Sequence, residues 1–168
     1  VGLVHRTMIS YPYMKYVYAP DHIKIKEQGP TFSFVIETEN LGMAGLDDLR
    51  DTLNSLKAQT YPIERANEVL VIAAGHVSAE TFEVLRSEYP WATIYRIDEK
   101  LEYIQSKKRG AEKVTGDVVI FADSDVVYDT TWLENILYGF ITAPGATIVT
   151  GETRIRNYNI SLYAHAVQ

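Results

Sequence analysis

The sequence lacks cysteine, so neither a disulfide framework nor thiolate catalysis is open to this chain of 168 residues. A cysteine-free domain suits a reducing compartment, and we expect a cytoplasmic protein. The sequence also lacks any run of about 18 apolar residues, the length that a membrane-spanning helix needs, and no signal peptide is recognisable at its start. Contact with a membrane would therefore have to be peripheral.

Positive charge is scarce as well. The chain has 16 Lys and Arg against 22 Asp and Glu, which gives a net charge of −6. General nucleic-acid binding needs a basic stripe or patch, so we exclude nucleic acid as a partner. An acidic protein that handles phosphates would have to do so through a metal ion.

A glycine-rich phosphate loop is also missing. Such a loop after the first strand would indicate a P-loop or a Rossmann dinucleotide site. Here the first predicted strand ends in the polar residues Thr38, Glu39 and Asn40. This argues against both kinds of site.

What the sequence does contain is an alternation of strands and helices. Unalternated apolar runs predict strands covered on both faces, and stripes at helical spacing predict helices between them. The predicted strands are 31–37, 69–73, 93–97, 118–122 and 146–150, and the predicted helices are about 46–59, 79–89, 104–114 and 130–143. This order is typical of an α/β fold, a three-layer α/β/α arrangement with a mostly parallel, doubly wound, Rossmann-like sheet.

The length suits one domain. Residues 1–29 are predicted to be an irregular, tyrosine-rich arm, whose rings either pack against the domain or contact a protein partner or membrane surface. Residues 30–151 are the predicted folded domain, and residues 152–168 are a tail that leads toward a further region.

The stretch around which the sequence is organised is 116–128, where a buried strand ends on two aspartates. If the chain stays extended, Asp123 and Asp125 point the same way, about 6 to 7 Å apart. Their charges then repel by about 2 to 3 kcal/mol at an effective dielectric of about 20. A divalent cation would relieve this repulsion, and Mg²⁺ or Mn²⁺ prefers carboxylate oxygens together with substrate phosphates. The alternative is a turn in which an aspartate caps the helix starting near Thr130.

A second polar cluster favours the metal site over the cap. In doubly wound sheets the first and fourth strands commonly lie side by side, and ligands bind beyond their carboxyl ends. Residues 38–40 would then meet Asp123, Ser124 and Asp125. A capping turn alone gives no reason for polar residues at the matching place on the first strand.

With these residues placed, the chain resembles the GT-A fold glycosyltransferases of family 2, the inverting enzymes that use nucleotide-diphosphate sugars. The likeness runs from about Thr31 to Thr150. It rests on Thr38-x-Asn40, on Ser-Leu-Lys-Ala-Gln-Thr-Tyr-Pro at 55–62, on Arg109-Gly110-Ala111 leading to Thr115-Gly116-Asp117, and on Asp123-Ser124-Asp125 as a DxD motif.

The resemblance implies roles for several residues. Asp125 would bind a Mn²⁺ or Mg²⁺ ion that bridges the donor diphosphate, with Asp123 near the nucleotide ribose or the metal. Thr38 would belong to the nucleotide pocket, and its neighbours Glu39 and Asn40, together with Ser124, would line the donor site. The partners implied are a nucleotide-diphosphate sugar and an unknown glycan, lipid or small-molecule acceptor.

Some residues depart from the family pattern. Where members commonly carry an aspartate that holds the uracil edge, this chain has Ala74 within Ala-Ala-Gly-His at 73–76. Glu37 replaces the usual proline, and Glu39 replaces an aromatic residue that often stacks near the base. Lys107 stands near the position of an arginine and would supply a cation without its bidentate fork.

The family's catalytic base usually lies on an acidic motif well downstream of the DxD. We therefore expect this chain to be truncated at the C-terminus, with the base outside it. Glu152 and His165 are the titratable residues after the fifth predicted strand whose chemistry suits a base, but neither lies in an acidic motif.

Two other functions compete with a metal-dependent glycosyltransferase. A non-catalytic binding or assembly module with a degenerate donor pocket is favoured by Ala73 and Ala74 and opposed by Asp123 and Asp125. A nucleotidyltransferase-like enzyme fits the strand order but lacks a glycine-rich, basic loop after the first strand.

Overall fold

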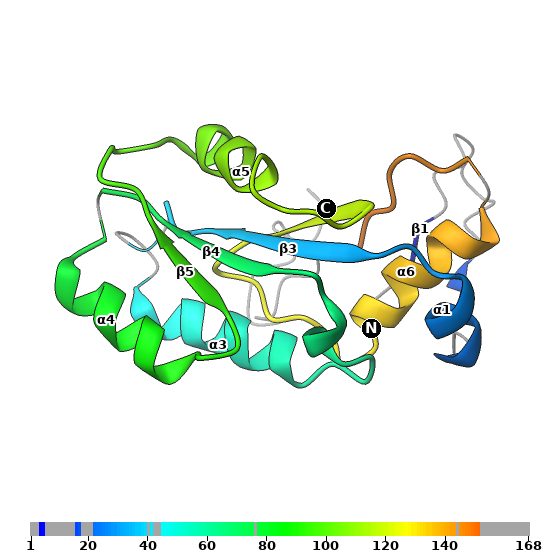
Figure 1. Cartoon of the computed structure of the whole chain (residues 1–168). Coiled ribbons are helices and arrows are strands. Elements are labelled where there is room, and N and C mark those ends of the chain that lie inside the picture. The colour runs from blue at the N-terminus through cyan, green and yellow to red at the C-terminus, as the bar shows by residue number, and fades with distance from the viewer. Residues whose placement is uncertain are drawn as a thin grey trace, which may run out of the picture.

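The protein has a four-stranded, all-parallel sheet in the order β5-β4-β3-β6 (Figure 1). The computed structural model describes residues 4–5, 16–17, 22–39, 41, 45–75, 77–143 and 145–151. The strands are β3 (Phe32–Glu37), β4 (Val69–Ala73), β5 (Thr93–Arg96) and β6 (Val118–Ala122). Each lies within a segment that its apolar run predicts, so the predicted α/β class is confirmed.

Helices cover both faces of the sheet, which confirms the three layers. Helix α5 (Tyr103–Ala111) lies on one face, and α3 (Leu46–Lys57), α4 (Ala79–Glu88) and α6 (Trp132–Thr142) lie on the other (Figure 1). The Ser78 hydroxyl accepts the Thr81 N–H at 3.0 Å and caps α4, as its position predicts. Within the described residues, none of the helices has the length and apolar character that crossing a membrane requires.

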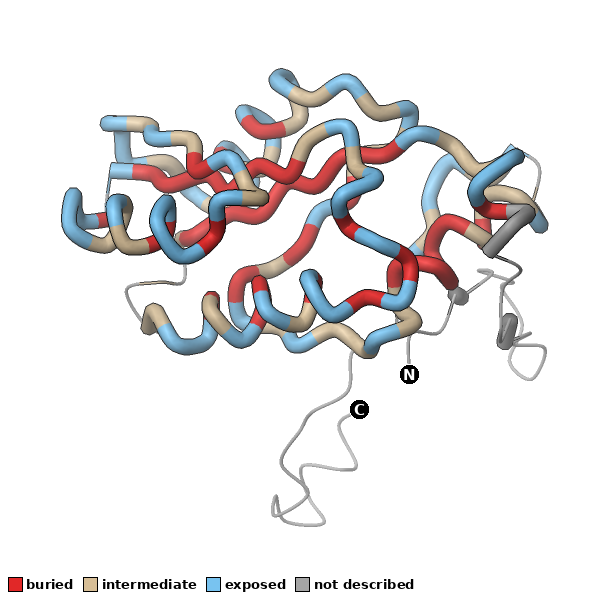
Figure 2. Tube along the Cα trace, turned by 60° about the horizontal axis from the view of Figure 1, so that its bottom comes forward, coloured by how far each residue is buried: buried red, intermediate tan, exposed pale blue. Residues whose placement is uncertain are grey.

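The core divides into two parts along the two faces of β3. Phe34 and Ile36 face the larger part, beneath α3, α4 and α6, whereas Val35 faces a smaller part beneath α5. All six residues of β3 and all five of β4 are buried, as the red tube segments of Figure 2 show. Burial on both faces explains why these strands show no polar alternation.

The connection from β5 to β6 crosses back over the sheet, so that β6 pairs with β3. Ile36 lies opposite Ala122, and Val35 lies opposite Phe121. The residues that follow each strand, Thr38 and Asp123, therefore lie at the same edge. The first and fourth strands of the predicted set are neighbours, as the sequence predicts.

The N-terminal residues 1–29, predicted to be irregular, include regular structure. Helix α1 (His22–Gln28) precedes β3, and β1 (Val4–His5) pairs in antiparallel fashion with β2 (Tyr16–Val17). Ile25 of α1 is buried in the larger core. Its burial provides the tertiary packing that a short helix requires.

The fifth predicted strand, 146–150, does not form as a strand. Thr150 makes an isolated bridge, and the Ile148 side chain is 74% exposed. The segment instead lines a cavity of about 810 Å³ with residues of β6 and α6, among them Phe121, Trp132 and Phe140. The β-branched residues predicted a strand from local propensity, but the strand order of the described sheet ends at β6.

We expect Gly110→Ala to destabilise the protein by about 1 to 3 kcal/mol, because it overpacks the contact between α5 and the sheet. A Cβ atom at Gly110 would lie 2.3 Å from Val35 Cγ1. Urea unfolding measures the change. Val35→Ala removes the atoms that the new Cβ would contact. The double variant with both changes should therefore lose less stability than the sum of the losses in the two single variants. Lys108→Ala, exposed on the same helix, is the control and should stay within about 0.5 kcal/mol of the wild type. An unchanged Gly110→Ala would contradict the close packing.

Candidate functional site

The two aspartates of the DxD motif lie in different surroundings just beyond β6. The chain turns at Ser124 and Asp125 instead of continuing as a strand, so the extended spacing expected between the aspartates does not apply. Ser124 is buried, Asp123 is partly buried, and Asp125 is exposed. Of the two aspartates, Asp125 is thus the more exposed.

In the alternative interpretation, an aspartate of the DxD motif caps the helix that follows. In the structure a different aspartate, Asp129, lies at the start of that helix. Helix α6 begins at Trp132, and Asp129 Oδ1 accepts both the backbone N–H and the hydroxyl of Thr131, at 3.0 and 2.8 Å. Asp129 therefore provides the side-chain acceptor near the start of α6. The DxD residues lie further back, directly after β6.

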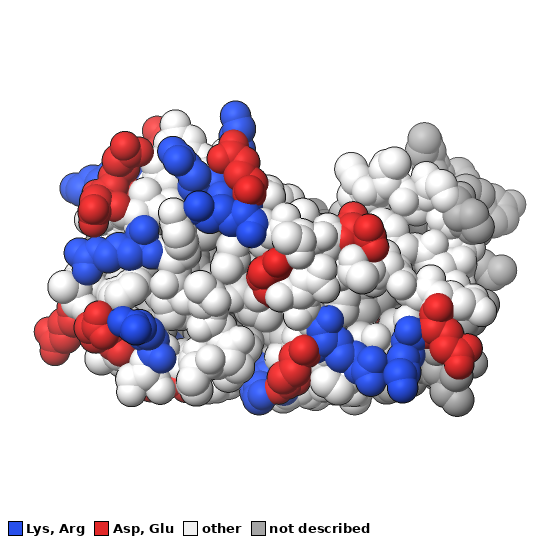
Figure 3. Space-filling view, viewed as in Figure 1, with Lys and Arg blue, Asp and Glu red and all other residues white. Residues whose placement is uncertain are grey.

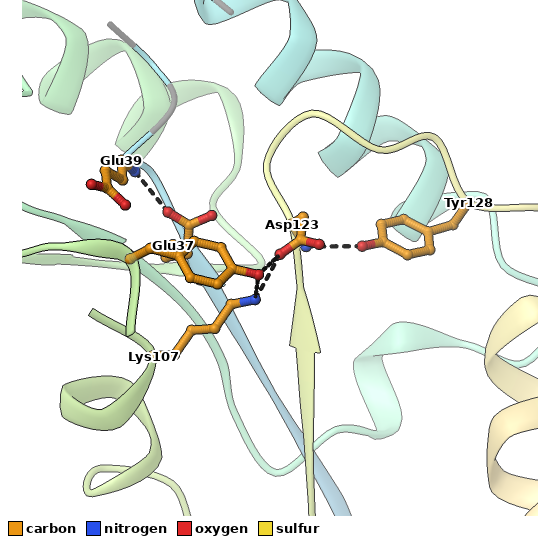
Figure 4. Close-up of polar contacts among 6 residues, drawn as sticks. Glu37, Glu39, Lys107, Asp123 and Tyr128 are labelled. Atoms are coloured by element: carbon orange, nitrogen blue, oxygen red, sulfur yellow. Dashed lines mark hydrogen bonds and ion pairs between the residues drawn. The ribbon is translucent and has the colours of Figure 1, made fainter. Parts of the chain in front are cut away.

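Lys107 and Tyr103 of α5 both bind Asp123. Figure 4 shows Lys107 beside Asp123. Lys107 Nζ lies 2.6 Å from Asp123 Oδ1, and the Tyr103 hydroxyl donates to the same oxygen at 2.7 Å. Lys107 also donates to the Tyr103 hydroxyl and lies 3.9 Å from the centre of its ring. One carboxylate oxygen of Asp123 is therefore held by two side chains of α5.

The surroundings of Lys107 favour its charged form. Burial alone would lower the Lys107 pKa, but hydrogen bonds to Asp123 and Tyr103, together with the Asp123 charge, leave the pKa raised. The Lys107 side chain is only 14% exposed. A partly buried cation paired with a carboxylate interacts more strongly than an exposed pair does.

Glu37 places a second carboxylate on the same side of the sheet. It is the last residue of β3 and lies two positions from Val35, so it points toward α5. It is fully buried; Oε2 accepts the Glu39 N–H at 2.7 Å, whereas Oε1 has no hydrogen-bond partner. Burial raises the Glu37 pKa, an effect that the Glu39 N–H and the Lys107 charge oppose and the Asp123 charge reinforces. Figure 4 shows Glu37 close to Lys107 and Asp123.

The structure also locates the other residues predicted for the donor site. The Thr38 hydroxyl is buried and donates to the Ile72 carbonyl at 2.8 Å, so it joins β3 to β4. Glu39 is half-buried beside Glu37, and Ala74 is buried at the end of β4. Asn40 and His76 lie outside the described residues. The carboxyl edge of the sheet thus brings together Thr38, Glu39, Lys107 and Asp123, with Ala74 on the next strand.

The segment 55–62 holds the loop between the DxD turn and α6. Ser55 Oγ accepts the Tyr128 N–H at 3.0 Å, and Gln59 bonds to the Asp129 carbonyl and the Leu133 N–H at 2.7 and 2.8 Å. The Tyr128 hydroxyl in turn accepts the Asp123 N–H at 3.0 Å. This part of the motif therefore supports the acidic turn from behind.

The segment 115–117 lies at the opposite end of the sheet. The Thr115 hydroxyl donates to Glu68 at 2.7 Å, and the Gly116 N–H donates to the Ser33 hydroxyl at 3.0 Å. Asp117 accepts the Thr31 hydroxyl at 2.7 Å. These residues fix the start of β6 against β3 and take no part in the candidate site.

Three site residues were not assigned from the sequence: Tyr103, Tyr128 and, as a buried carboxylate, Glu37. Tyr103 lies four positions before Lys107, and this helical spacing is the one local signal that could have placed it, although the predicted helix 104–114 begins one residue later than α5 does. The contact of Tyr128 with Asp123 depends on a loop conformation that no periodic pattern encodes. The comparison with the family pattern marks Glu37 only as a replacement for proline.

The charges around the site determine what it can bind. In the part of the chain that the structure describes, no three His, Cys, Asp or Glu side chains form a cluster that would by itself hold a metal. A Mg²⁺ or Mn²⁺ ion that binds through one or two carboxylates and substrate phosphates needs no such cluster. On the face drawn in Figure 3, basic side chains gather over α5 with acidic side chains beside them, so charges of both signs border the site.

Comparisons with known proteins indicate the family of this chain. The sequence model of Glycosyl transferase family 2 matches residues 33–168. A curated relative, the glucosyl-dolichyl phosphate glucuronosyltransferase of Haloferax volcanii, is 27% identical over 113 residues, which are 65% of this chain and 34% of the relative.

Two solved structures share the fold. Mannosyltransferase PcManGT from Pyrobaculum calidifontis, in complex with GDP-Man and Mn²⁺, has a TM-score of 0.58 and 20% identity, and the match covers 75% of this chain and 35% of that chain. S. aureus TarS 1-349 has a TM-score of 0.53 and 21% identity, over 67% of this chain and 32% of that chain. This chain spans about a third of the length of the relatives it matches.

We expect the stability of the Glu37→Gln variant, relative to that of the wild type, to increase as the pH rises. The folded protein raises the Glu37 pKa above its ordinary value of 4.5, so the folded state holds the proton more tightly than the unfolded state. The stability that this proton contributes is present in full below 4.5 and is lost as the pH rises through the folded pKa. Urea unfolding of both proteins from about pH 4 to about pH 8 measures the difference.

The control is Ser106→Ala, which alters a buried residue of α5 without removing a titratable group. Its difference from the wild type should stay constant with pH. The same constancy in Glu37→Gln would contradict the raised Glu37 pKa.

Proposed function

Because this chain belongs to glycosyltransferase family 2, we propose that it binds a nucleotide-diphosphate sugar beyond the carboxyl ends of β3 and β6 and takes part in sugar transfer with inversion. The observation that carries this proposal is that the pairing of β3 with β6 places Thr38 and Glu39 at the same edge of the sheet as Asp123, which Lys107 binds. Parallel α/β sheets bind ligands at the carboxyl ends of strands where the strand order reverses. Here that reversal lies between β3 and β6.

The residues present suit a divalent cation. Asp125 is exposed directly after β6 and would be the principal ligand, with Asp123 beside it and the donor diphosphate providing further oxygens. A bound Mn²⁺ or Mg²⁺ ion would supply positive charge to the leaving diphosphate.

The chain's own residues have separable roles. Lys107 and Tyr103 hold one oxygen of Asp123 and so fix its carboxylate at the mouth of the site. Lys107 would also present a cation to the nucleotide. Inversion requires a carboxylate to deprotonate the acceptor hydroxyl, and we assign that role to none of the described residues. The Haloferax volcanii relative is named for a dolichyl-phosphate-linked sugar, so we include lipid-linked sugars among the acceptors to be tested.

The second candidate is a binding module without transfer activity. The observation that favours it is the occupation of Asp123 Oδ1 by Lys107 and Tyr103, which leaves that oxygen less available to a metal. Ala74 also favours a binding module, because its side chain offers no hydrogen bond to a nucleotide base. Donor binding with and without metal separates the two candidates.

We expect Mn²⁺ together with a nucleoside diphosphate to raise the melting temperature, and Asp125→Ala to abolish that rise. A ligand at about 100 times its Kd adds about 2.7 kcal/mol, which corresponds to roughly 5 to 10 °C in a domain of this size. A thermal-shift panel with and without Mn²⁺ measures the effect. Asp48→Ala, which removes an exposed aspartate of α3, is the control and should keep the full rise. A wild type that shows no metal-dependent shift with any nucleotide would refute the donor site.

We expect the wild type to distinguish uridine diphosphate poorly from the other nucleoside diphosphates. Ala74 stands where the family resemblance places a base-reading carboxylate, and a site without that partner imposes little desolvation penalty on the wrong base. Calorimetric titration of the four nucleoside diphosphates with Mn²⁺ measures the discrimination. Ala74→Asp, if its melting temperature stays near that of the wild type, should create a uridine preference worth about 1 to 3 kcal/mol. Strong uridine preference in the wild type would mean that another residue, such as Glu39, reads the base.

A further inference from the structure

The loop between β6 and α6 carries the acidic turn but has no regular secondary structure of its own. Residues 123–131 contain neither helix nor strand. The conformation of such a segment depends on where its backbone groups find hydrogen-bond partners. In this loop many of those partners are side chains of α3 and of the turn that follows it.

Gln59 joins α3, this loop and the start of α6 through one side chain. Its Nε2 donates to the Ser55 carbonyl at 3.0 Å and to the Asp129 carbonyl at 2.7 Å, and its Oε1 accepts the Leu133 N–H at 2.8 Å. Both donors and the acceptor of the amide are thus used, and the residue is only 7% exposed. A buried amide that loses a partner carries an unmet desolvation cost, so these bonds hold the loop in one arrangement.

Neighbouring residues of α3 and its C-terminal turn reinforce the same loop. The Thr52 hydroxyl donates to the Val126 carbonyl at 2.8 Å, and the Thr60 N–H donates to the Thr130 carbonyl at 2.8 Å. Ser55 Oγ accepts the Tyr128 N–H. We call these four residues, Thr52, Ser55, Gln59 and Thr60, the α3 clamp.

The α3 clamp connects to the acidic turn through Tyr128. The Tyr128 N–H donates to Ser55 Oγ, and the Tyr128 hydroxyl accepts the Asp123 N–H at 3.0 Å. The centres of the Tyr128 and Trp132 rings are 4.4 Å apart. A continuous set of contacts therefore runs from Gln59 through the loop to the backbone of Asp123.

We propose that Gln59 is a positioning residue for donor binding, which holds the turn of Asp123 and Asp125 in the arrangement that accepts a cation and a diphosphate. This inference rests on the proposed function. Gln59 lies behind the loop and touches neither carboxylate in any of its hydrogen bonds. Its effect is exerted through the backbone at Asp129 and Leu133, as outer residues orient the ligands of a metal.

The test compares Gln59→Leu with the wild type in two measurements. The first is the affinity for uridine diphosphate and guanosine diphosphate, each with and without Mn²⁺. We expect the Mn²⁺-dependent affinity to fall about 10- to 100-fold and the metal-free affinity to change little, because losing an outer-shell contact mainly misplaces the cation ligands. The second is amide hydrogen exchange, which should quicken in residues 123–131 before it quickens in β3 or β4.

Ser33→Ala is the matched control. Ser33 is a buried polar residue at the opposite end of β3, where it donates to Glu68 and accepts the Gly116 N–H. This change removes comparable hydrogen bonds but should leave Mn²⁺-dependent affinity at the wild-type value. Ser55→Ala removes one bond of the α3 clamp to the loop, from the Tyr128 N–H, and one bond within α3, to the Thr52 carbonyl. It serves if Gln59→Leu does not fold, and we expect the same selective loss, of smaller size.

The outcomes separate the inference from the function on which it rests. Unchanged exchange in 123–131, or faster exchange with unchanged Mn²⁺-dependent affinity, would overturn the role of Gln59 and leave the donor site in place. An equal loss in Ser33→Ala would also overturn it, because the effect would then follow stability alone. A wild type without Mn²⁺-dependent binding would overturn the proposed function, and the inference with it.

Discussion

The burial of β3 on both faces is the constraint on which the rest of the structure depends. All six of its residues are buried, with β4 paired on one edge and β6 on the other. Such a strand accommodates polar groups at low cost only near its ends, where water or neighbouring loops can reach them. The polar residues of the candidate site therefore lie at the carboxyl edge of the sheet, and the N-terminal edge is closed by the bond of Ser33 to Glu68.

Glu37 lies at the carboxyl end of β3 but is fully buried, and it shapes the electrostatics of the site. A fully buried carboxyl with one unpaired oxygen is costly when ionised, and burial raises its pKa accordingly. Lys107 is the nearby cation and is bonded directly to Asp123. A single lysine thus interacts with two carboxylates of different solvation. Any phosphate that approaches Lys107 would compete with Asp123 for this cation, which couples donor binding to the position of the first DxD aspartate.

The sequence determines the strands and helices more fully than it does the site. Four apolar runs became β3 to β6, and the GT-A fold expected from the resemblance is confirmed by the shared fold of solved structures. The run 146–150 shows why the fifth strand was wrong: β-branched residues favour a strand, but pairing requires a partner edge, and here the segment lines a cavity beside β6. Local propensity carries no information about that partner.

The candidate site was predicted to the extent that it depends on strand ends. The approach of Thr38 to Asp123 follows from parallel pairing, which an alternation of strands and helices implies. The bonds from Tyr103 and Lys107 to Asp123 require α5 to cross above β3 at one particular rotation. Those from Gln59 to the loop require residues about 70 positions apart to meet. Neither set of bonds is encoded in the spacing of residues along the sequence, because both sets depend on how rigid elements pack together.

The positions of the sequence motifs in the structure affect what those motifs indicate about activity. The segments 55–62 and 115–117 resemble those of active enzymes, yet in this structure they bind backbone and neighbouring side chains at a distance from any carboxylate of the DxD. A binding module would need them as much as an enzyme, since both must hold the same loop and the same strand. Their presence therefore supports the fold and the shape of the acidic turn equally under either function. The residues that would discriminate between the two functions are those proposed to face the donor, above all Asp125, Lys107 and Ala74. Transfer would further require an acceptor-side base, a role that we assign to none of the described residues.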